Sequence, residues 1–245
     1  MKQSTLLVLN CLADGCFHSG SEIGDAAGVS RAAVWKQLQK LIDIGLDVES
    51  VKGKGYRLAG GFEPLERGSI QSGLSVECAA LVSEIDLHAE IESTNVHAMK
   101  RIAAGNAKGY LCLSESQSSG KGRRGRHWVS PFGHNIYLSF VWEFDGGANQ
   151  LEGLSLAVGV EVAKVLITCG LQGVALKWPN DILLNGRKLG GILLEMSGDP
   201  AGVCQVVIGI GLNVRMNKNM AIDQPWASVS EQLASVSRNK LVSGV

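Results

Sequence analysis

A basic, glycine-rich segment near the middle of the chain has the residue types best suited to chemistry. No acidic residue occurs between Glu115 and Glu143, so the cations in this span have no nearby sequence partner. The span contains the glycines Gly120, Gly122 and Gly125 and the cations Lys121, Arg123, Arg124 and Arg126. Guanidinium groups offer planar, paired donors to phosphoryl oxygens. The pattern predicts an anion-binding loop without regular structure, although a charge run taken alone is more often a solvated loop.

The glycines of this segment also match the G-x-G-x-x-G pattern of dinucleotide-binding turns. Such a turn opens a helix whose N-terminus receives the pyrophosphate. The residues that follow here lead instead into a strand-like run over 135–144, with no helix for a phosphate to cap. The sequence therefore argues against a Rossmann-type site and favours clamping of phosphate by side chains.

The N-terminal part of the chain, before the elements that position this loop, is predicted to be a small helical module. The spacing of leucines predicts a first helix with Leu6, Leu9 and Leu12 on one face. A capping box from Ser19 to Glu22 predicts the start of a second helix.

A third helix is predicted to begin after Ser30 as its N-cap. Apolar side chains recur at the spacing of one helical face, and they are Val34, Leu38, Leu41 and Ile42. A short helix, a turn at Gly28 and a longer helix with a polar outer face form a helix-turn-helix.

Two short strands are predicted next, over 46–51 and 56–58, and a tip with two lysines joins them. A helix-turn-helix followed by such a hairpin resembles the winged-helix DNA-binding fold, in which the recognition helix reads base edges and the wing reaches phosphate. The candidate DNA-binding residues are Ser30, Arg31, Ala32, Ala33, Trp35, Lys36, Lys52 and Lys54. The alternative is a generic three-helix domain that docks another protein.

In the remainder of the chain, the spacing of apolar residues predicts a mixture of strands and helices. Strands are predicted over 85–91, 110–115, 135–144, 174–178, 181–184, 188–196 and 205–214, and helices over 95–104 and 153–169. The first of these helices is expected to start under a Ser-Thr cap at 93–94, whereas residues 235–245 read as a polar tail. Because short turns join several strands, we expect a mixed sheet backed by helices.

Composition narrows the class of protein. A chain of 245 residues with zero net charge and 45% hydrophobic residues fits a globular enzyme, in which any nucleic-acid contact must come from a local patch. No apolar run approaches the ~18 residues of a membrane helix, and no signal peptide is present, so we expect a cytoplasmic protein without membrane contact. The six cysteines lack C-x-x-C spacing, which predicts neither disulfides nor a zinc site.

Five short stretches resemble, in order and spacing, the biotin protein ligases. These stretches are residues 92–95, 117–128, 177–181, 187–193 and 209–213. Residues 18–20, 30–33 and 52–56 look like the DNA-binding domain of the bifunctional ligases that also repress biotin synthesis. The resemblance implies an α/β fold, with an α+β mixed sheet backed by helices as in class II synthetases and a small N-terminal winged helix-turn-helix domain.

The resemblance also implies a reaction in two steps. The carboxylate of biotin attacks the α-phosphate of ATP to give biotinyl-5′-AMP, and a lysine of the biotin carboxyl carrier protein of acetyl-CoA carboxylase then takes the acyl group. Because the first step brings one anion to another, cations must be fixed around the reacting centre. Further implications are Mg²⁺ as a cofactor, a homodimer on adenylate binding, and repression of the biotin biosynthesis operon through operator DNA.

The resemblance assigns site residues by their match to the family's motifs. The implied catalytic residues are Lys188, Arg123 and Asp181. The implied biotin contacts are Ser93, Thr94, Asn95, Gln117, Arg123, Lys188, Gly191 and Gly209. The implied ATP or adenylate contacts are Gly120, Lys121, Gly122, Arg123, Arg124, Gly125, Arg126, Trp128, Asn135, Asn180, Asn213 and Trp226. For Asp181 two roles stay open, orientation of Mg²⁺ and deprotonation of the incoming lysine.

The sequence departs from the family pattern at two places. Lys121 stands where arginine is usual, which keeps the charge but loses the guanidinium fork. The family normally continues with a small β-barrel, so we expect a winged-helix domain over 1–60, a linker over 61–65 and a ligase domain over 66–245 with the C-terminal β-barrel absent. The alternative function is a regulator that senses biotin or its adenylate with little or no ligase activity. A lipoate ligase relative is disfavoured by the motifs at 120–125 and 177–181.

Overall fold

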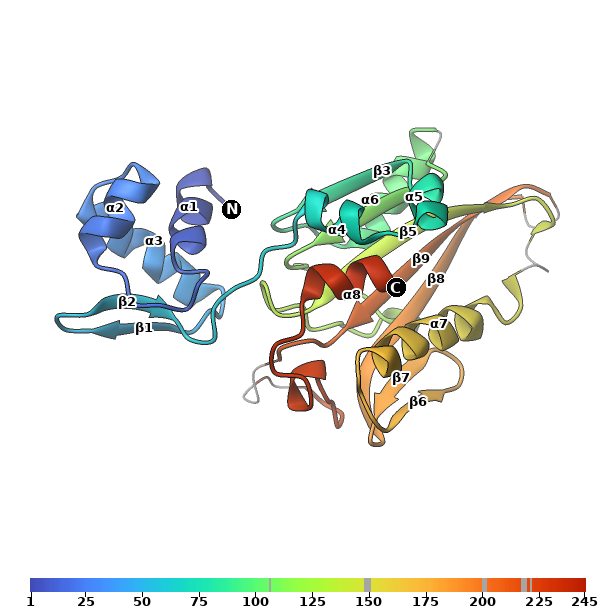
Figure 1. The fold of residues 1–245 in the computed structure, drawn as a ribbon. Coiled ribbons are helices and arrows are strands. Elements are labelled where there is room, and N and C mark those ends of the chain that lie inside the picture. Colours follow the sequence, from blue (N-terminus) through green and yellow to red (C-terminus); the bar gives the residue numbers. More distant parts are fainter. Residues whose placement is uncertain (106, 148–150, 200–201, 217–219, 221) are drawn as a thin grey trace. The chain divides into compact units, whose positions relative to one another are not determined.

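The computed structural model describes residues 1–105, 107–147, 151–199, 202–216, 220 and 222–245, drawn as a ribbon in Figure 1. These residues form two compact units. The first unit consists of Met1–Pro64 together with Pro131–Gly133, and the second consists of Leu65–Ser130 and His134–Val245. No helix in the described part of the chain is long and apolar enough to cross a bilayer.

The first unit contains three helices and a two-stranded hairpin (Figure 1). Its elements are α1 (Gln3–Cys11), α2 (Gly20–Ala27), α3 (Arg31–Asp43), β1 (Val48–Val51) and β2 (Gly55–Leu58). The predicted capping box is confirmed, because Glu22 N–H donates to Ser19 Oγ at 3.2 Å while Ser19 N–H donates to the Glu22 carboxylate at 2.7 Å. The hydrogen bond from Ser19 N–H lowers the pKa of Glu22.

Two residues predicted on the buried faces of α1 and α3, Leu6 and Ile42, are not fully buried. Leu9 and Leu12 are fully buried, but Leu6 is only half-buried and Val8 takes its place in the core. A spacing of three residues drifts around a helix by about 60° per step, so three leucines so spaced cannot all face inward. Ile42 is 44% exposed for a similar reason, since it lies about 100° around α3 from the buried Leu41.

The hairpin closes against the loop between α1 and α2. His18 and Tyr56 exchange two backbone hydrogen bonds of 2.8 Å, so the loop adds a short third strand to the β1–β2 pair. A Cβ atom on Gly55 would overlap the carbonyl oxygen of His18, and the φ of Gly55 is +100°. The close approach of the wing to this loop therefore requires glycine at this position.

The second unit is built on a seven-stranded mixed sheet. Its strands are β3 (Glu84–His88), β4 (Tyr110–Ser114), β5 (Ile136–Phe144), β6 (Val174–Lys177), β7 (Asp181–Leu184), β8 (Arg187–Gly198) and β9 (Cys204–Leu212). The order across the sheet is β3-β4-β5-β9-β8-β7-β6, with β3 and β4 parallel and every other neighbouring pair antiparallel. All seven predicted strands are present, with ends moved by at most three residues.

Helices cover both faces of this sheet. They are α4 (Arg67–Gly73), α5 (Val76–Leu81), α6 (Thr94–Ala103), α7 (Leu154–Thr168) and α8 (Arg238–Gly244). Leu111 and Leu113 of β4 join the larger core with residues of α4, α7 and α8, whereas Tyr110 and Cys112 point to the opposite face and pack with α6. The prediction of a mixed sheet backed by helices is confirmed.

The predicted polar tail was wrong in its structure. Residues 238–244 form α8, in which Leu241 and Val242 are buried in the larger core. Arg238 is also buried, and its guanidinium lies 2.7 Å from the carboxylate of Glu115, which is distant in the sequence. A charged residue is expected to be exposed when only the sequence is known, and the carboxylate that follows β4 is what makes its burial tolerable.

Candidate functional site

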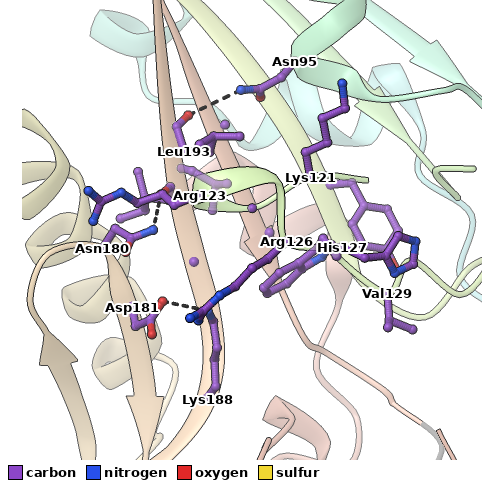
Figure 2. A pocket seen from close by; sticks show the side chains of 18 of the residues that line it. Asn95, Lys121, Arg123, Arg126, His127, Val129, Asn180, Asp181, Lys188 and Leu193 are labelled. Carbon is purple, nitrogen blue, oxygen red and sulfur yellow. Dashed lines mark hydrogen bonds and ion pairs between the residues drawn. The ribbon is translucent and has the colours of Figure 1, made fainter. Parts of the chain in front are cut away.

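A cavity of ≈ 900 Å³ in the second unit contains most of the predicted site (Figure 2). It lies between the start of α6, the basic loop formed by residues 117–128, the β6–β7 turn and the faces of β8 and β9. The predicted residues on its lining are Ser93, Thr94, Asn95, Gln117, Lys121, Gly122, Arg123, Arg124, Arg126, Trp128, Asn180, Asp181, Lys188, Gly191 and Gly209. Segments that are far apart in the sequence, from Ser93 to Gly209, thus line one cavity.

The basic loop is more ordered than predicted. Trp128 N–H donates to Gly120 O at 2.9 Å and Gly122 N–H donates to Arg126 O at 2.8 Å, so the two sides of the loop pair as a small hairpin. Its tip is a 3₁₀ turn over Arg123–Gly125, in which Arg124 has a φ of 57°. The expectation of a span without regular structure was wrong, because paired backbone groups hold the loop's two sides together.

The lining of the cavity is strongly cationic. It contains six Lys or Arg side chains and two Asp side chains, the cations being Lys121, Arg123, Arg124, Arg126, Lys177 and Lys188. Among the described residues, only Lys188 of these cations lies within 4.0 Å of a carboxylate. Positive charge without a protein partner suits a polyanionic ligand, as the sequence predicted.

Lys188 and Asp181 face each other across neighbouring strands. The Nζ atom of Lys188 lies 2.7 Å from Oδ1 of Asp181, and both side chains are largely shielded, with exposed fractions of 18% and 23% (Figure 2). Beside them, Asn180 donates its amide hydrogen to Ile192 O at 2.7 Å. Asp181, the last residue of the predicted motif over 177–181, therefore fixes the direction of the Lys188 side chain.

Trp128 lies over two glycines of the sheet. Gly191 of β8 pairs with Gly211 of β9, and a Cβ atom built on Gly211 would come 2.7 Å from the indole ring. The Nζ atom of Lys188 is 5.6 Å from the ring centroid, within cation–π range. The indole Nε1 is buried and has no hydrogen-bond partner among the described residues. A buried donor without an acceptor inside a cavity fits a ligand that supplies one.

One end of the cavity is polar but uncharged. Gln117 Oε1 accepts hydrogen bonds from Thr94 N at 2.9 Å and Thr94 Oγ1 at 3.2 Å, and Ser139 Oγ lies 2.8 Å from Thr94 Oγ1. Ser93 occupies the N-cap position of α6, as predicted, but its side chain makes no capping hydrogen bond. Gln117 accepts the N–H of Thr94, the first residue of the helix. Ser93 is buried and lines the cavity, and no capping hydrogen bond occupies its hydroxyl.

Asn95 of α6 closes this polar end against the strands of the sheet. Its Nδ2 donates to Glu195 at 2.7 Å and its Oδ1 lies 2.6 Å from Ser139 Oγ. A Cβ atom on Gly209 would overlap Oδ1 of Asn95, so the glycine makes room for the amide. Asn95 and Gly209 stay predicted ligand contacts, and the structure shows that they pack against each other.

Five predicted contacts do not line the cavity, namely Gly120, Gly125, Asn135, Asn213 and Trp226. Asn135 is fully buried, and its Oδ1 accepts a hydrogen bond from Val214 N at 2.9 Å. Asn213 donates to Ala227 O at 3.1 Å. Both amides are therefore committed to holding backbone segments together.

The other three positions, Gly120, Gly125 and Trp226, stay predicted contacts, and the structure shows what surrounds each of them. A Cβ atom on Gly120 would lie 2.7 Å from Trp128 O, whereas Gly125 adopts a φ of +72° that favours glycine at the loop tip. Trp226 is half-buried beside Lys188, and the nearby side chains of Asp223 and Gln224 line the cavity in its place.

Several lining residues were missed by the sequence interpretation. Tyr137 and Leu138 of β5 reach the cavity, and burial raises the pKa of the Tyr137 phenol so that it remains a neutral hydroxyl. The strand prediction over 135–144 contained the signal, but strand pattern alone does not say which residues border a ligand.

The predicted DNA-binding residues lie in the first unit and are mostly exposed. Arg31, Ala32, Trp35 and Lys36 on α3 and Lys52 and Lys54 at the wing tip are exposed, and Ala33 is half-buried. Ser30 is exposed as well, but its hydroxyl accepts a hydrogen bond from Ala33 N at 3.2 Å as the N-cap of α3. At the wing tip, the Nζ atom of Lys54 lies 5.8 Å from the ring centroid of Phe17, a contact that orients the lysine side chain. The helix start and wing thus offer a basic, accessible face.

Comparison with known protein families assigns both units. The model of the Biotin/lipoate A/B protein ligase family matches residues 87–213, which contain most of the cavity lining. The model of an HTH domain matches residues 5–57, which run from within α1 to within β2.

Comparison with individual proteins agrees with this assignment. The chain is 42% identical to the bifunctional ligase/repressor BirA of Salmonella typhimurium and 41% identical to that of Escherichia coli, covering 98% of this chain and 74% of each relative. Among solved structures, it is similar to the biotin protein ligase from Aquifex aeolicus in complex with biotin and ATP, with 28% identity, a TM-score of 0.54 and coverage of 65% of each chain. The Leishmania major biotin protein ligase in complex with biotin gives 26% identity and a TM-score of 0.54 over 66% of this chain and 71% of that chain.

Proposed function

Because the chain belongs to the Biotin/lipoate A/B protein ligase family, we propose that it is a biotin protein ligase and a biotin-responsive repressor. In this proposal the ligase joins biotin to a lysine of the biotin carboxyl carrier protein of acetyl-CoA carboxylase, and the first unit binds operator DNA in the cytoplasm. One observation supports the ligase assignment above others. A neutral polar end formed by Ser93 and Gln117 and a cationic end formed by Lys188 and the basic loop belong to one cavity.

The two ends match the two ends of the proposed first substrate. The ureido ring of biotin is small and neutral and needs both donors and acceptors, which Ser93 and Gln117 provide. The biotin carboxylate then points toward Lys188, which Asp181 holds at 2.7 Å. Shape and polarity therefore favour one orientation of biotin, with its reacting end among the cations.

In the first step a carboxylate oxygen of biotin bonds to the α-phosphorus of ATP as the bond from that phosphorus to pyrophosphate breaks. Negative charge gathers on the phosphoryl oxygens, and Lys188 and Arg123 offset it from fixed positions. The Nε1 of Trp128, which has no acceptor among the described residues, would be a further donor to the adenylate. The cation–π contact between Lys188 and the Trp128 ring limits the positions that the ammonium group and the indole can adopt.

In the second step the amine of the carrier lysine attacks the acyl carbon, the bond from that carbon to the phosphate oxygen breaks, and AMP leaves. The amine loses a proton to complete the amide. Asp181 is the nearest described carboxylate to Lys188, but its contact with this lysine supports a positioning role over that of a base.

Of the two Asp side chains on the cavity lining, Asp181 is the one beside Lys188 and could hold magnesium. Asp181 is a single carboxylate whose Oδ1 already contacts Lys188, and Mg²⁺ is usually bound by one or two carboxylates together with substrate phosphates. Asp181 would hold an ion that arrives with ATP, and such an ion would offset phosphate charge.

The repressor half of the proposal rests on the first unit. An exposed recognition helix and a wing with two lysines suit contact with base edges and phosphate. We propose that the adenylate, once bound, favours a homodimer that fits a two-fold operator.

The test is ATP-dependent transfer of labelled biotin to a purified carrier domain. Lys188→Ala is expected to lower the transfer rate by about 10²–10³-fold, as removal of a fixed charge from a reacting centre typically does. The matched control is Lys164→Ala, which removes a 63% exposed lysine of α7. Equal transfer by Lys188→Ala and the parent would overturn the proposed site. Background transfer by the parent, with operator binding intact, would favour a biotin-sensing regulator.

A further inference from the structure

A second cluster of functional side chains lies outside the cavity, on the face of the sheet that α6 covers. Asp86 and His88 are alternate residues of β3, so both side chains point to the same face. His97 comes from the first part of α6, and its ring packs edge-on against that of His88 with centroids 4.7 Å apart. None of these three residues lines the cavity.

The donor atoms of this cluster are close enough to share one ion. The Oδ2 atom of Asp86 lies 3.0 Å from His88 Nε2 and 3.3 Å from His97 Nε2, and all three residues offer donor atoms within 4.8 Å of one another. A tetrahedral zinc ion with bonds of about 2.0–2.1 Å places its ligand atoms about 3.3 Å apart. Small side-chain rotations therefore bring the three donors to coordination distance.

One of the donors is poorly satisfied by the protein. His88 Nε2 is buried and has no hydrogen bond of good geometry among the described residues, in spite of its closeness to Asp86. Buried polar atoms normally find a partner, so this nitrogen points to a ligand that supplies one.

A neighbouring hydroxyl orients the carboxylate. Tyr110 of β4 donates its O–H to Asp86 Oδ2 at 2.5 Å. Outer hydrogen bonds of this kind hold carboxylate ligands in metal sites. The side chains of Asp86, His88 and His97 keep exposed fractions of 28%, 27% and 35%, which leaves a path to solvent and room for a water ligand.

We propose that Asp86, His88 and His97 bind one divalent transition-metal ion of the zinc type. Two imidazoles and one carboxylate suit Zn²⁺ and its neighbours in the first transition row, whereas Mg²⁺ and Ca²⁺ prefer sites made of oxygen atoms. The ion joins β3 to α6, and the start of α6 carries Ser93, Thr94 and Asn95 into the cavity. The proposed metal site thus links β3 to α6 outside the cavity and contributes no residue to the cavity lining.

The experiment uses the full chain, freed of metal by a chelator and without biotin or ATP. Calorimetric titration with Zn²⁺ alone is expected to show one equivalent bound, and Co²⁺ is expected to give the visible absorption bands of a four-coordinate ion. Loss of outer-shell partners typically costs 10–100-fold in affinity, so His97→Ala, which removes a direct ligand, is expected to cost at least ~100-fold. Asp86→Asn preserves the size of the side chain and is expected to weaken binding as well.

His18→Ala is the matched control, because His18 also lies 3.0 Å from a carboxylate, that of Asp14. This variant is expected to keep the zinc site intact. Circular dichroism of each metal-free variant separates loss of binding from loss of folding, and zinc is expected to raise the Tm of the parent but not of Asp86→Asn. Equal zinc affinity in the parent and both cluster variants, no stoichiometric binding by the parent, or loss of binding in His18→Ala would overturn the proposal.

Discussion

The ammonium group of Lys188 lies 2.7 Å from the carboxylate of Asp181, on adjacent antiparallel strands. The same ammonium lies 5.6 Å from the ring centroid of Trp128. An acid on one side and an aromatic face on the other limit the positions that this flexible side chain can adopt, so the lysine is held in place before a ligand arrives.

Asp181→Asn is expected to slow the activation of biotin while leaving the fold intact. The amide keeps the shape of the carboxylate but not its charge, so Lys188 is held less well, and a displacement of about 1 Å can cost ~10²-fold in rate. Pyrophosphate exchange measures the first step separately from transfer. Asp145→Asn, at an exposed position of the second unit, is the control. A positioning role predicts a fall in kcat with a smaller change in KM, and an unchanged kcat would contradict it.

Arg123→Gly is expected to let the adenylate escape. Arg123 begins the 3₁₀ turn of the basic loop and lines the cavity, so its removal takes away a cation that no described carboxylate neutralises. The dissociation rate of preformed biotinyl-5′-AMP, followed by stopped-flow fluorescence, is expected to rise by at least about tenfold, the effect of losing ~1.4 kcal/mol. Arg67→Gly at the exposed start of α4 serves as the control. An adenylate that dissociates at the parental rate would remove Arg123 from the site.

Gly211→Ala is expected to displace Trp128. A Cβ atom at this position would lie 2.7 Å from the indole, whereas the same atom on the paired Gly191 would meet nothing closer than 3.6 Å. Overpacking typically costs about 1–3 kcal/mol, so Gly211→Ala should lower the free energy of unfolding by this amount and Gly191→Ala should not. Urea denaturation and tryptophan emission measure both effects. Equal stability of the two variants would show that the indole moves aside freely.

Arg238→Met is expected to destabilise the second unit by about 3–5 kcal/mol, because it leaves the carboxylate of Glu115 buried without its guanidinium partner. Arg101→Met offers a matched comparison. Arg101 pairs with Glu84 at 2.8 Å, but the side chains are 43% and 45% exposed, so its loss should cost less than about 1 kcal/mol. Chemical denaturation of both variants measures the difference, and similar losses would contradict the importance of burial.

Replacement of Lys52 and Lys54 by alanine is expected to weaken DNA binding at all sequences. Every phosphate that a lysine no longer neutralises reduces the steepness of log affinity against log salt by about 0.9, so the double variant should show a reduction of up to about 1.8. Arg31→Ala, at the first residue of α3, is expected to relax sequence preference instead. Fluorescence anisotropy at several salt concentrations separates these effects, with Lys164→Ala in the other unit as control. A wing variant with the parental salt slope would exclude binding of phosphate by the wing.

Local features of this protein were predictable because short-range patterns encode them. The capping box at Ser19 and the N-cap at Ser30 depend on residues three apart, and the structure has both. The strands of the second unit were found for the same reason, since periodicity is a local property. The order and spacing of the motifs at 117–128 and 177–181 likewise indicated the family that comparison then showed.

Roles that depend on a distant partner were beyond the sequence. Ser93 was predicted both at the cap of α6 and as a biotin contact, and the sequence did not show that the distant Gln117 accepts the N–H of Thr94 next to it. Asn135 stays a predicted ligand contact, and the sequence did not show that its amide oxygen accepts a hydrogen bond from the N–H of the distant Val214.

The sequence by itself determined that this chain has a helix-turn-helix module, a mixed sheet and a basic loop, because each follows from the spacing of neighbouring residues. Only the tertiary structure decided that Arg238 is buried against Glu115 and that His97 meets Asp86 behind the cavity. Such contacts depend on the register of strands and on the face a helix presents, and both are fixed by packing of the whole sheet and not by local propensity.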